Sequence, residues 1–166
     1  RTMLDELMER EQITRPVEWF YTPMALPFAG HVEASLVVYD CMDELSAFLG
    51  APPKLRELES ELLRRADLVF TGGQSIYESK RERHPAVYAF PSSVDAAHFQ
   101  SARQGLLEAS DQTTLPHPRI GFFGVVDERL DLGMLASVAE LRPTWSFVVV
   151  GPVVKIDPAS LPHRSN

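Results

Sequence analysis

The stretch PPKLRELESELLRRADLVFTGGQSIYESKRERHPAVYAF, residues 52–90, holds two helical patterns that alternate with two strand patterns. After the proline pair, apolar side chains recur at helical spacing on one face, at Leu55, Leu58, Leu62 and Ala66. Two short apolar runs, Asp67–Thr71 and Ala86–Phe90, have the length of strands, and between them we expect a turn and a helix capped by Ser75. This alternation through short connections indicates a parallel sheet with helices on its faces.

The same alternation extends in both directions from this stretch. Val17–Tyr21 and Ser35–Asp40 are predicted to be earlier strands, and the second, SLVVYD, is apolar along nearly its whole length, as expected for a buried parallel strand. Later in the chain, Arg119–Phe123 and Trp145–Val150 enclose one helical pattern. The sequence therefore predicts an α/β fold of Rossmann-like parallel sheet units with flanking helices.

Composition narrows the class of protein. The chain of 166 residues has 16 Lys and Arg against 23 Asp and Glu, a net charge of −7, which argues against nucleic acid as the main partner. Its one cysteine, Cys41, cannot form an internal disulfide, and no Cys/His set has the spacing of a zinc site. No apolar run approaches the ~20 residues that span a bilayer. We expect a cytoplasmic protein that meets a membrane only from its surface. Because the first residue is Arg1, inside a helical pattern, we also expect a piece of a longer chain.

Candidate site residues follow the strands, because ligands of open parallel sheets bind beyond the carboxyl ends of the strands. Asp40 ends the apolar run 35–40 and Asp43 follows it, at a strand end where a carboxylate can act as a general base toward a hydroxyl. The alternative is that Asp43 or Ser46 caps a following turn and Asp40 binds loop amides. Their spacing is not that of a metal-binding pair, so we predict no metal.

Glycines mark the ends of three other strands. Gly124 would let backbone approach a phosphate, and Arg129 could add a charged contact. Gly72, Gly73 and Gly151 also stand at strand ends. Each of these glycines could equally be an ordinary turn residue.

Four segments, in order, resemble the group 1 glycosyltransferases of GT-B fold, whose two Rossmann-like domains face each other across a cleft. The segments are ESELLRRADLVFTGGQSIY (59–77), FPSSVDAAHF (90–99), RIGFFGVVDERLD (119–131) and FVVVGP (147–152). The resemblance implies that residues 1–99 are the latter part of the acceptor-side domain, 100–117 a linker, and 118–166 the incomplete start of the nucleotide-sugar domain.

The resemblance also implies roles for particular residues. Asp40 or Asp43 would be the acceptor-side base or contact, with Gly72, Gly73, Ser93 and Asp95 in loops near the acceptor or the cleft. Gly124, Arg129 and Gly151 would lie beside the donor diphosphate. The common family form has Arg directly after that glycine and Lys-Gly later, whereas Val125 and Arg129-Leu130 stand here.

The function implied is transfer of a sugar from a nucleotide-diphosphate sugar to a hydroxyl of a glycan or lipid-linked acceptor. We expect a role in polysaccharide or glycolipid synthesis, a location in the cytoplasm or at the inner face of the membrane, and no cofactor or metal. The family's glycine-rich acceptor loop and its pair of glutamates eight residues apart are absent, so we expect residues 1–166 alone to be nearly inactive. The alternatives are a non-catalytic module that binds a sugar nucleotide or a protein, and a GT-B-fold sugar-nucleotide epimerase.

Overall fold

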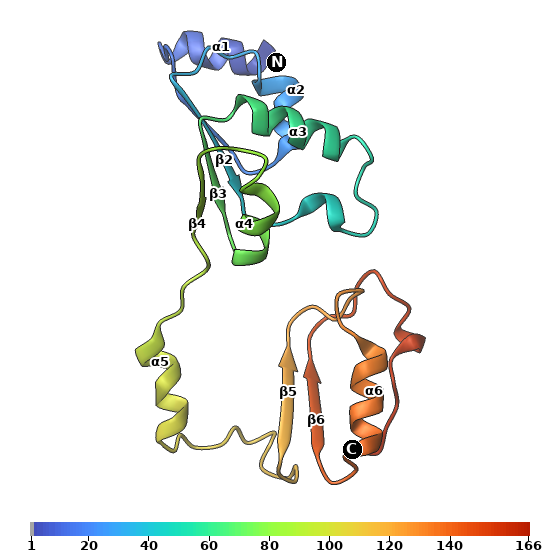
Figure 1. The fold of residues 1–166 in the computed structure, drawn as a ribbon. Helices are drawn as coiled ribbons and strands as arrows, with labels where there is room; N and C mark the ends of the chain where they lie inside the picture. The colour runs from blue at the N-terminus through green and yellow to red at the C-terminus, as the bar shows by residue number, and fades with distance from the viewer. Residues whose placement is uncertain (1) are drawn as a thin grey trace. The chain divides into compact units, whose positions relative to one another are not determined.

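The computed structural model describes residues 2–166, which form two compact units, the first ending at Asp95 and the second beginning at Ala96. The first unit holds a sheet of four strands in the order β1-β2-β3-β4 (Figure 1). The strands are β1 (Val17–Phe20), β2 (Leu36–Cys41), β3 (Leu68–Thr71) and β4 (Val87–Ala89). Every neighbouring pair is parallel. The predicted α/β class with a parallel, helix-flanked sheet is confirmed.

One helix precedes the first strand, and further helical segments connect the strands. They are α1 (Thr2–Arg10), η1 (Pro23–Ala25), α2 (Leu26–Ala29), η2 (Leu45–Ala47), α3 (Leu55–Arg65) and α4 (Gln74–Lys80). The predicted cap at Ser75 is wrong, because α4 begins at Gln74 and the extended residue Gly73 precedes it. The Gly73 carbonyl accepts the first helical hydrogen bond, from the Tyr77 amide, so the chain enters the helix one residue earlier than a serine cap would allow.

The core of the first unit lies on one face of its sheet. Parallel crossovers are right-handed, so a chain that adds each strand on the same side of the previous one puts its helices on the same face. Figure 1 shows α3 and α4 there. Tyr39 and Val69 from the strands pack with Leu62 of α3, whose side chain is 0% exposed. Burial of one such leucine stabilises the fold by about 1.5–3 kcal/mol.

The opposite face of this sheet carries aromatic side chains. Residues alternate between faces along a strand, so Trp19, Asp40 and Phe70 lie on this face, away from the core. The Phe70 ring lies 5.5 Å from Trp19 and 5.1 Å from Phe90, measured between centroids, and 6.3 Å from Tyr88. Trp19 and Tyr88 remain about half exposed, at 48% and 51%.

The second unit is a smaller strand–helix–strand arrangement. Its parallel strands are β5 (Arg119–Phe123) and β6 (Ser146–Val150), with α6 (Leu132–Leu141) between them in the chain. Asp131 caps α6 by accepting the Met134 amide at 2.8 Å. The short segments α5 (Ala96–Gln100), η3 (Ser101–Gln104) and η4 (Pro158–Ser160) complete the unit. Residues 96–104, part of the region expected to be the end of the first domain and the linker, are therefore helical.

Candidate functional site

The loops after β2 and β3 meet at the carboxyl edge of the first sheet. The Gly72 amide donates to the Cys41 carbonyl at 3.1 Å. A Cβ atom on Gly72 would lie 2.8 Å from the carbonyl oxygen of Met42 and 3.0 Å from its Cα, so this backbone contact requires glycine. The structure thus brings Gly72 against the segment between Asp40 and Asp43, as expected for parallel strands.

Asp40 and Asp43 occupy different surroundings. Asp40 lies within β2 and faces the aromatic side of the sheet, where its Oδ2 accepts the indole N–H of Trp19 at 3.1 Å. Asp43 lies in the loop beyond the strand and is exposed. Its carbonyl accepts the Leu45 amide at 3.0 Å, so its backbone, and not its side chain, closes the turn.

Directly after Asp43, the carboxylate of Glu44 binds a buried lysine. Lys80, in the last turn of α4, is 1% exposed. Its Nζ donates to both carboxylate oxygens of Glu44 at 2.9 and 2.8 Å and lies 2.8 Å from Oε1 of Glu59. The Tyr39 hydroxyl donates to Glu59 at 3.1 Å, and Arg83 donates to its other oxygen at 3.2 Å. We name Glu44, Glu59, Lys80, Arg83 and Tyr39 the Lys80 cluster.

Burial and hydrogen bonding in the Lys80 cluster shift the pKa values of Lys80, Glu44 and Tyr39. Burial alone would lower the pKa of Lys80, but hydrogen bonds from its ammonium to Glu44 and Glu59 outweigh burial and raise that pKa. Burial would raise the pKa of Glu44, and the hydrogen bonds from Lys80 lower it instead. Burial raises the pKa of the Tyr39 phenol and of the Cys41 thiol, so both stay neutral near pH 7. Sequence analysis missed this cluster because Lys80 has the pattern of an ordinary lysine at the end of a helix.

The remaining predicted residues of the first unit lie in exposed or open positions. Gly73 has open space where a Cβ would stand. Ser93 and Asp95 are exposed in the coil after β4. Because β4 is parallel to β3, that coil leaves the sheet at the same edge as the other loops.

Two predicted glycines of the second unit lie against each other. Gly124 follows β5 and Gly151 follows β6, with φ angles of 147° and 154°. A Cβ on Gly151 would lie 1.7 Å from the carbonyl oxygen of Gly124. The Gly124 amide donates to the Val150 carbonyl at 2.9 Å, so this amide is already engaged and is not a hydrogen-bond donor for a ligand. We name this close approach the glycine junction.

Arg129 is held by a carboxylate that sequence analysis did not select. Asp127, 3% exposed, accepts from Nε of Arg129 at 2.9 Å and from Nη2 at 2.7 Å. This pairing lowers the pKa of Asp127, through the side-chain hydrogen bonds from Arg129 first. The Arg129 side chain is nevertheless 61% exposed. Both residues line a hollow of about 310 Å³ with Phe122, Val125 and Leu130.

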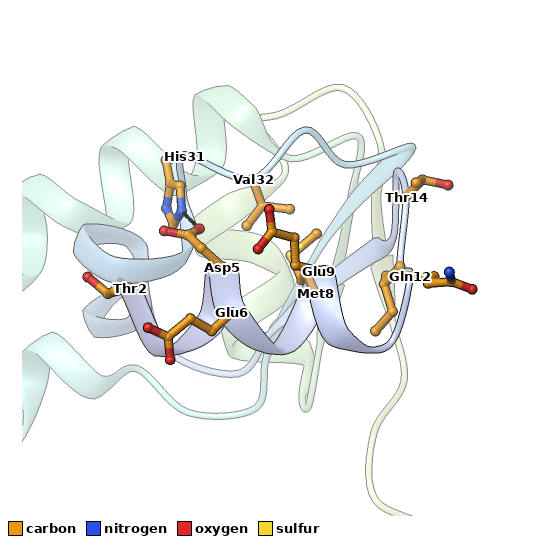
Figure 2. Close-up of a pocket in the computed structure, with 10 residues that line it drawn as sticks. Thr2, Asp5, Glu6, Met8, Glu9, Gln12, Thr14, His31 and Val32 are labelled. Atoms are coloured by element: carbon orange, nitrogen blue, oxygen red, sulfur yellow. Dashed lines mark hydrogen bonds and ion pairs between the residues drawn. The ribbon is translucent and has the colours of Figure 1, made fainter.

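A larger hollow, of about 560 Å³, lies beside α1 and contains none of the predicted site residues. Figure 2 shows Asp5, Glu6 and Glu9 along it, with the His31 ring turned toward Asp5. His31 Nε2 and Asp5 Oδ1 form an ion pair or hydrogen bond. Three carboxylates make this hollow a poor site for a diphosphate, since like charges repel.

The described residues contain neither a metal-binding cluster nor a membrane-spanning helix. Within residues 2–166, no group of three or more His, Cys, Asp and Glu side chains is arranged to hold a metal ion. None of the helices in that range has the length and apolar character needed to cross a membrane. The expectation of metal-independent chemistry stays a prediction.

The chain is similar in sequence to a known protein. No protein-family model matches the chain. The chain is 23% identical, over 167 aligned positions, to the "Putative teichuronic acid biosynthesis glycosyltransferase TuaH" of Bacillus subtilis (strain 168). The alignment covers 90% of this chain and 41% of that protein, so the chain spans less than half of its relative's length. This similarity supports a relationship to glycosyltransferases.

Proposed function

We propose that this chain is part of a group 1 glycosyltransferase of GT-B fold that transfers a sugar from a nucleotide-diphosphate sugar to a hydroxyl acceptor. The observation that carries the proposal is the similarity to TuaH along 90% of the chain. We infer a role in polysaccharide or glycolipid synthesis, and the name of that relative refers to teichuronic acid biosynthesis. A lipid-linked acceptor would bring the cytoplasmic protein to the inner face of the membrane.

The donor side of the proposal rests on the second unit. The glycine junction packs the backbones at the carboxyl ends of β5 and β6 against each other, so neither Gly124 nor Gly151 places a side chain between this edge and a bound diphosphate. The α6 N-terminus is already capped by Asp131, so we assign the charged contact to Arg129 instead. A guanidinium is suited to phosphate oxygens, because its planar N–H groups can form paired charge-assisted hydrogen bonds. Stabilising the departing diphosphate is the main electrostatic task in such a transfer.

The acceptor side rests on the first unit. A general base needs an accessible carboxylate within hydrogen-bond reach of the acceptor hydroxyl. Asp43 meets the first requirement, because it is exposed in the loop beyond β2. Asp40 is turned to the aromatic face and accepts from Trp19, which makes it the weaker candidate. We therefore assign the acceptor-side role to Asp43.

The proposal is tested by ligand-induced stabilisation of the full-length protein. UDP-glucose, UDP-N-acetylglucosamine, GDP-mannose and dTDP-rhamnose would each be added, with and without EDTA. A nucleotide sugar at about 100 times its Kd adds about 2.7 kcal/mol to the stability of the folded state. We expect a shift in Tm with at least one donor, and no effect of EDTA on it. Absence of any shift in a folded sample would contradict the proposal, and conversion of donor without an acceptor would select the epimerase alternative.

A further inference from the structure

We propose that Lys80 is a positioning residue that, through Glu44, holds Asp43 in place at the acceptor side of the site. This inference rests on the proposed function, because it assigns Asp43 a role in sugar transfer. Lys80 belongs to α4 and lies 36 positions along the chain from Glu44, the loop residue that it binds.

Burial of the Lys80 ammonium does not by itself stabilise the fold. An ammonium group that is 1% exposed loses nearly all contact with water. The free-energy cost of that lost hydration is offset only when the ammonium has oppositely charged partners in good hydrogen-bond geometry. Well-packed apolar residues in the same place are often equally stabilising. We therefore infer that the buried ion cluster selects one arrangement of the chain and contributes little net stability compared with apolar packing.

Lys80 links the packed core of the first unit to the loop after β2, because it contacts both Glu59 and Glu44. Two partners of Glu59 in α3 are fixed by the core: Tyr39 is buried in β2, and Lys80 itself is buried in α4. The remaining contacts of Lys80 go to both oxygens of Glu44, at 2.9 and 2.8 Å. Glu44 also accepts from Ser46 at 3.2 Å and Ser79 at 3.4 Å, so its carboxylate has four hydrogen bonds from three side chains.

Asp43 stands between two neighbours, Met42 and Glu44, that are both held in place. On one side of Asp43, the backbone of Met42 lies against Gly72, with no room for a side chain between them. On the other side, Glu44 is tied to Lys80. Asp43 itself is exposed. A site residue must be held within roughly 0.5 Å of its working geometry by its supporting groups, and an exposed loop residue reaches that precision only if its neighbours are fixed.

The test uses the full-length protein with Glu44→Ala, which removes the tie, and Glu44→Gln, which keeps its shape. Arg83→Ala is the matched control, because it removes a different cation from Glu59 without touching the loop. By hydrogen exchange we expect the amides of residues 42–47 to exchange about tenfold faster in Glu44→Ala, with β2 and β3 still protected. Glu44→Gln should lie between, and Arg83→Ala should leave the loop unchanged. Unchanged loop exchange in Glu44→Ala would overturn the inference.

Kinetics separates positioning from a general loss of stability. With the donor that stabilises the protein, we expect Glu44→Ala to lower kcat/KM for the acceptor about tenfold at an unchanged KM for the donor. Equal losses in Glu44→Ala and Arg83→Ala would show a merely structural role and overturn the inference. Full activity in Asp43→Asn would overturn it too, while leaving sugar transfer by the protein established. If the wild type binds no nucleotide sugar, the proposed function fails, and the exchange experiment still decides whether Lys80 holds the loop.

Discussion

Gly151 and Gly124 approach so closely that a Cβ atom on Gly151 would stand 1.7 Å from the Gly124 carbonyl oxygen. Backbone atoms cannot move aside as the end of a side chain can, so even alanine is excluded here. The φ of 154° at Gly151 adds a second penalty, since side-chain-bearing residues rarely adopt it.

We therefore expect Gly151→Ala to lower the free energy of unfolding of the second unit by about 2 kcal/mol or more. Urea denaturation of the full-length protein, followed through Trp145 fluorescence, would measure it. Gly121→Ala in β5 is the control, because a Cβ there meets nothing within 4 Å. Equal stability of the two variants would contradict the close approach.

Lys80→Met should destabilise the first unit strongly. The substitution keeps the length of the side chain but leaves the Glu44 and Glu59 carboxylates without their shared cation. Breaking a buried ion cluster from one side costs about 3–5 kcal/mol. Thermal unfolding would show a marked fall in Tm, whereas Lys54→Met, the same change at an exposed position, should leave Tm nearly unchanged.

The Lys80 cluster should also shape the dependence of stability on pH. The folded-state pKa of Glu44 lies below 4.5, so its contribution is present above pH 4.5 and is lost as pH falls through the folded pKa. The folded-state pKa of Lys80 lies above 10.5, so its contribution is complete below pH 10.5 and is lost as pH rises through the folded pKa. Urea unfolding at a series of acidic pH values should show Glu44→Gln losing less stability than the wild type. Parallel curves for the two proteins would argue against the ion pair.

Arg129→Gln should weaken binding of the donor without unfolding the protein. Loss of a charge-assisted hydrogen bond costs about 1.5–3 kcal/mol, which corresponds to roughly 10- to 150-fold in Kd. Isothermal titration with the nucleotide sugar that stabilises the protein would measure the change. Arg142→Gln, which removes the same charge near the amino end of β6, is the control and should bind normally. Equal Kd values for both variants would remove Arg129 from the donor site.

Asp43→Asn and Asp40→Asn should affect transfer very differently. Removing a general base lowers the rate by about 100-fold or more, so we expect that loss for Asp43→Asn. Asp40→Asn keeps an oxygen that can accept the indole N–H of Trp19, so its rate should stay within about threefold of the wild type. Initial rates at saturating donor would distinguish the two. The reverse order would move the acceptor-side role to Asp40.

The α/β class followed from local patterns in the sequence. The period of the apolar residues in α3 and the apolar runs of β2 and β3 indicate helix and strand, because backbone geometry sets which side chains share a face. The glycines at the strand ends were also visible, since a turn at that point favours a residue without a Cβ. The placement of Gly72 near Asp43 follows from the same reasoning, because loops after adjacent parallel strands leave at one edge.

What the tertiary structure decided is which side chains become partners. Lys80 is 36 positions from Glu44, Gly151 is 27 positions from Gly124, and Trp19 is 21 positions from Asp40. No local period carries such information, since each contact depends on the order of strands in the sheet and on the face to which a crossover returns. A lysine at the end of a helix is normally solvated, and only the close packing of α3, α4 and the loop after β2 makes Lys80 a buried cation. The sequence thus determined the elements and the edge where a site could form, and the packing of distant segments determined how that edge is held.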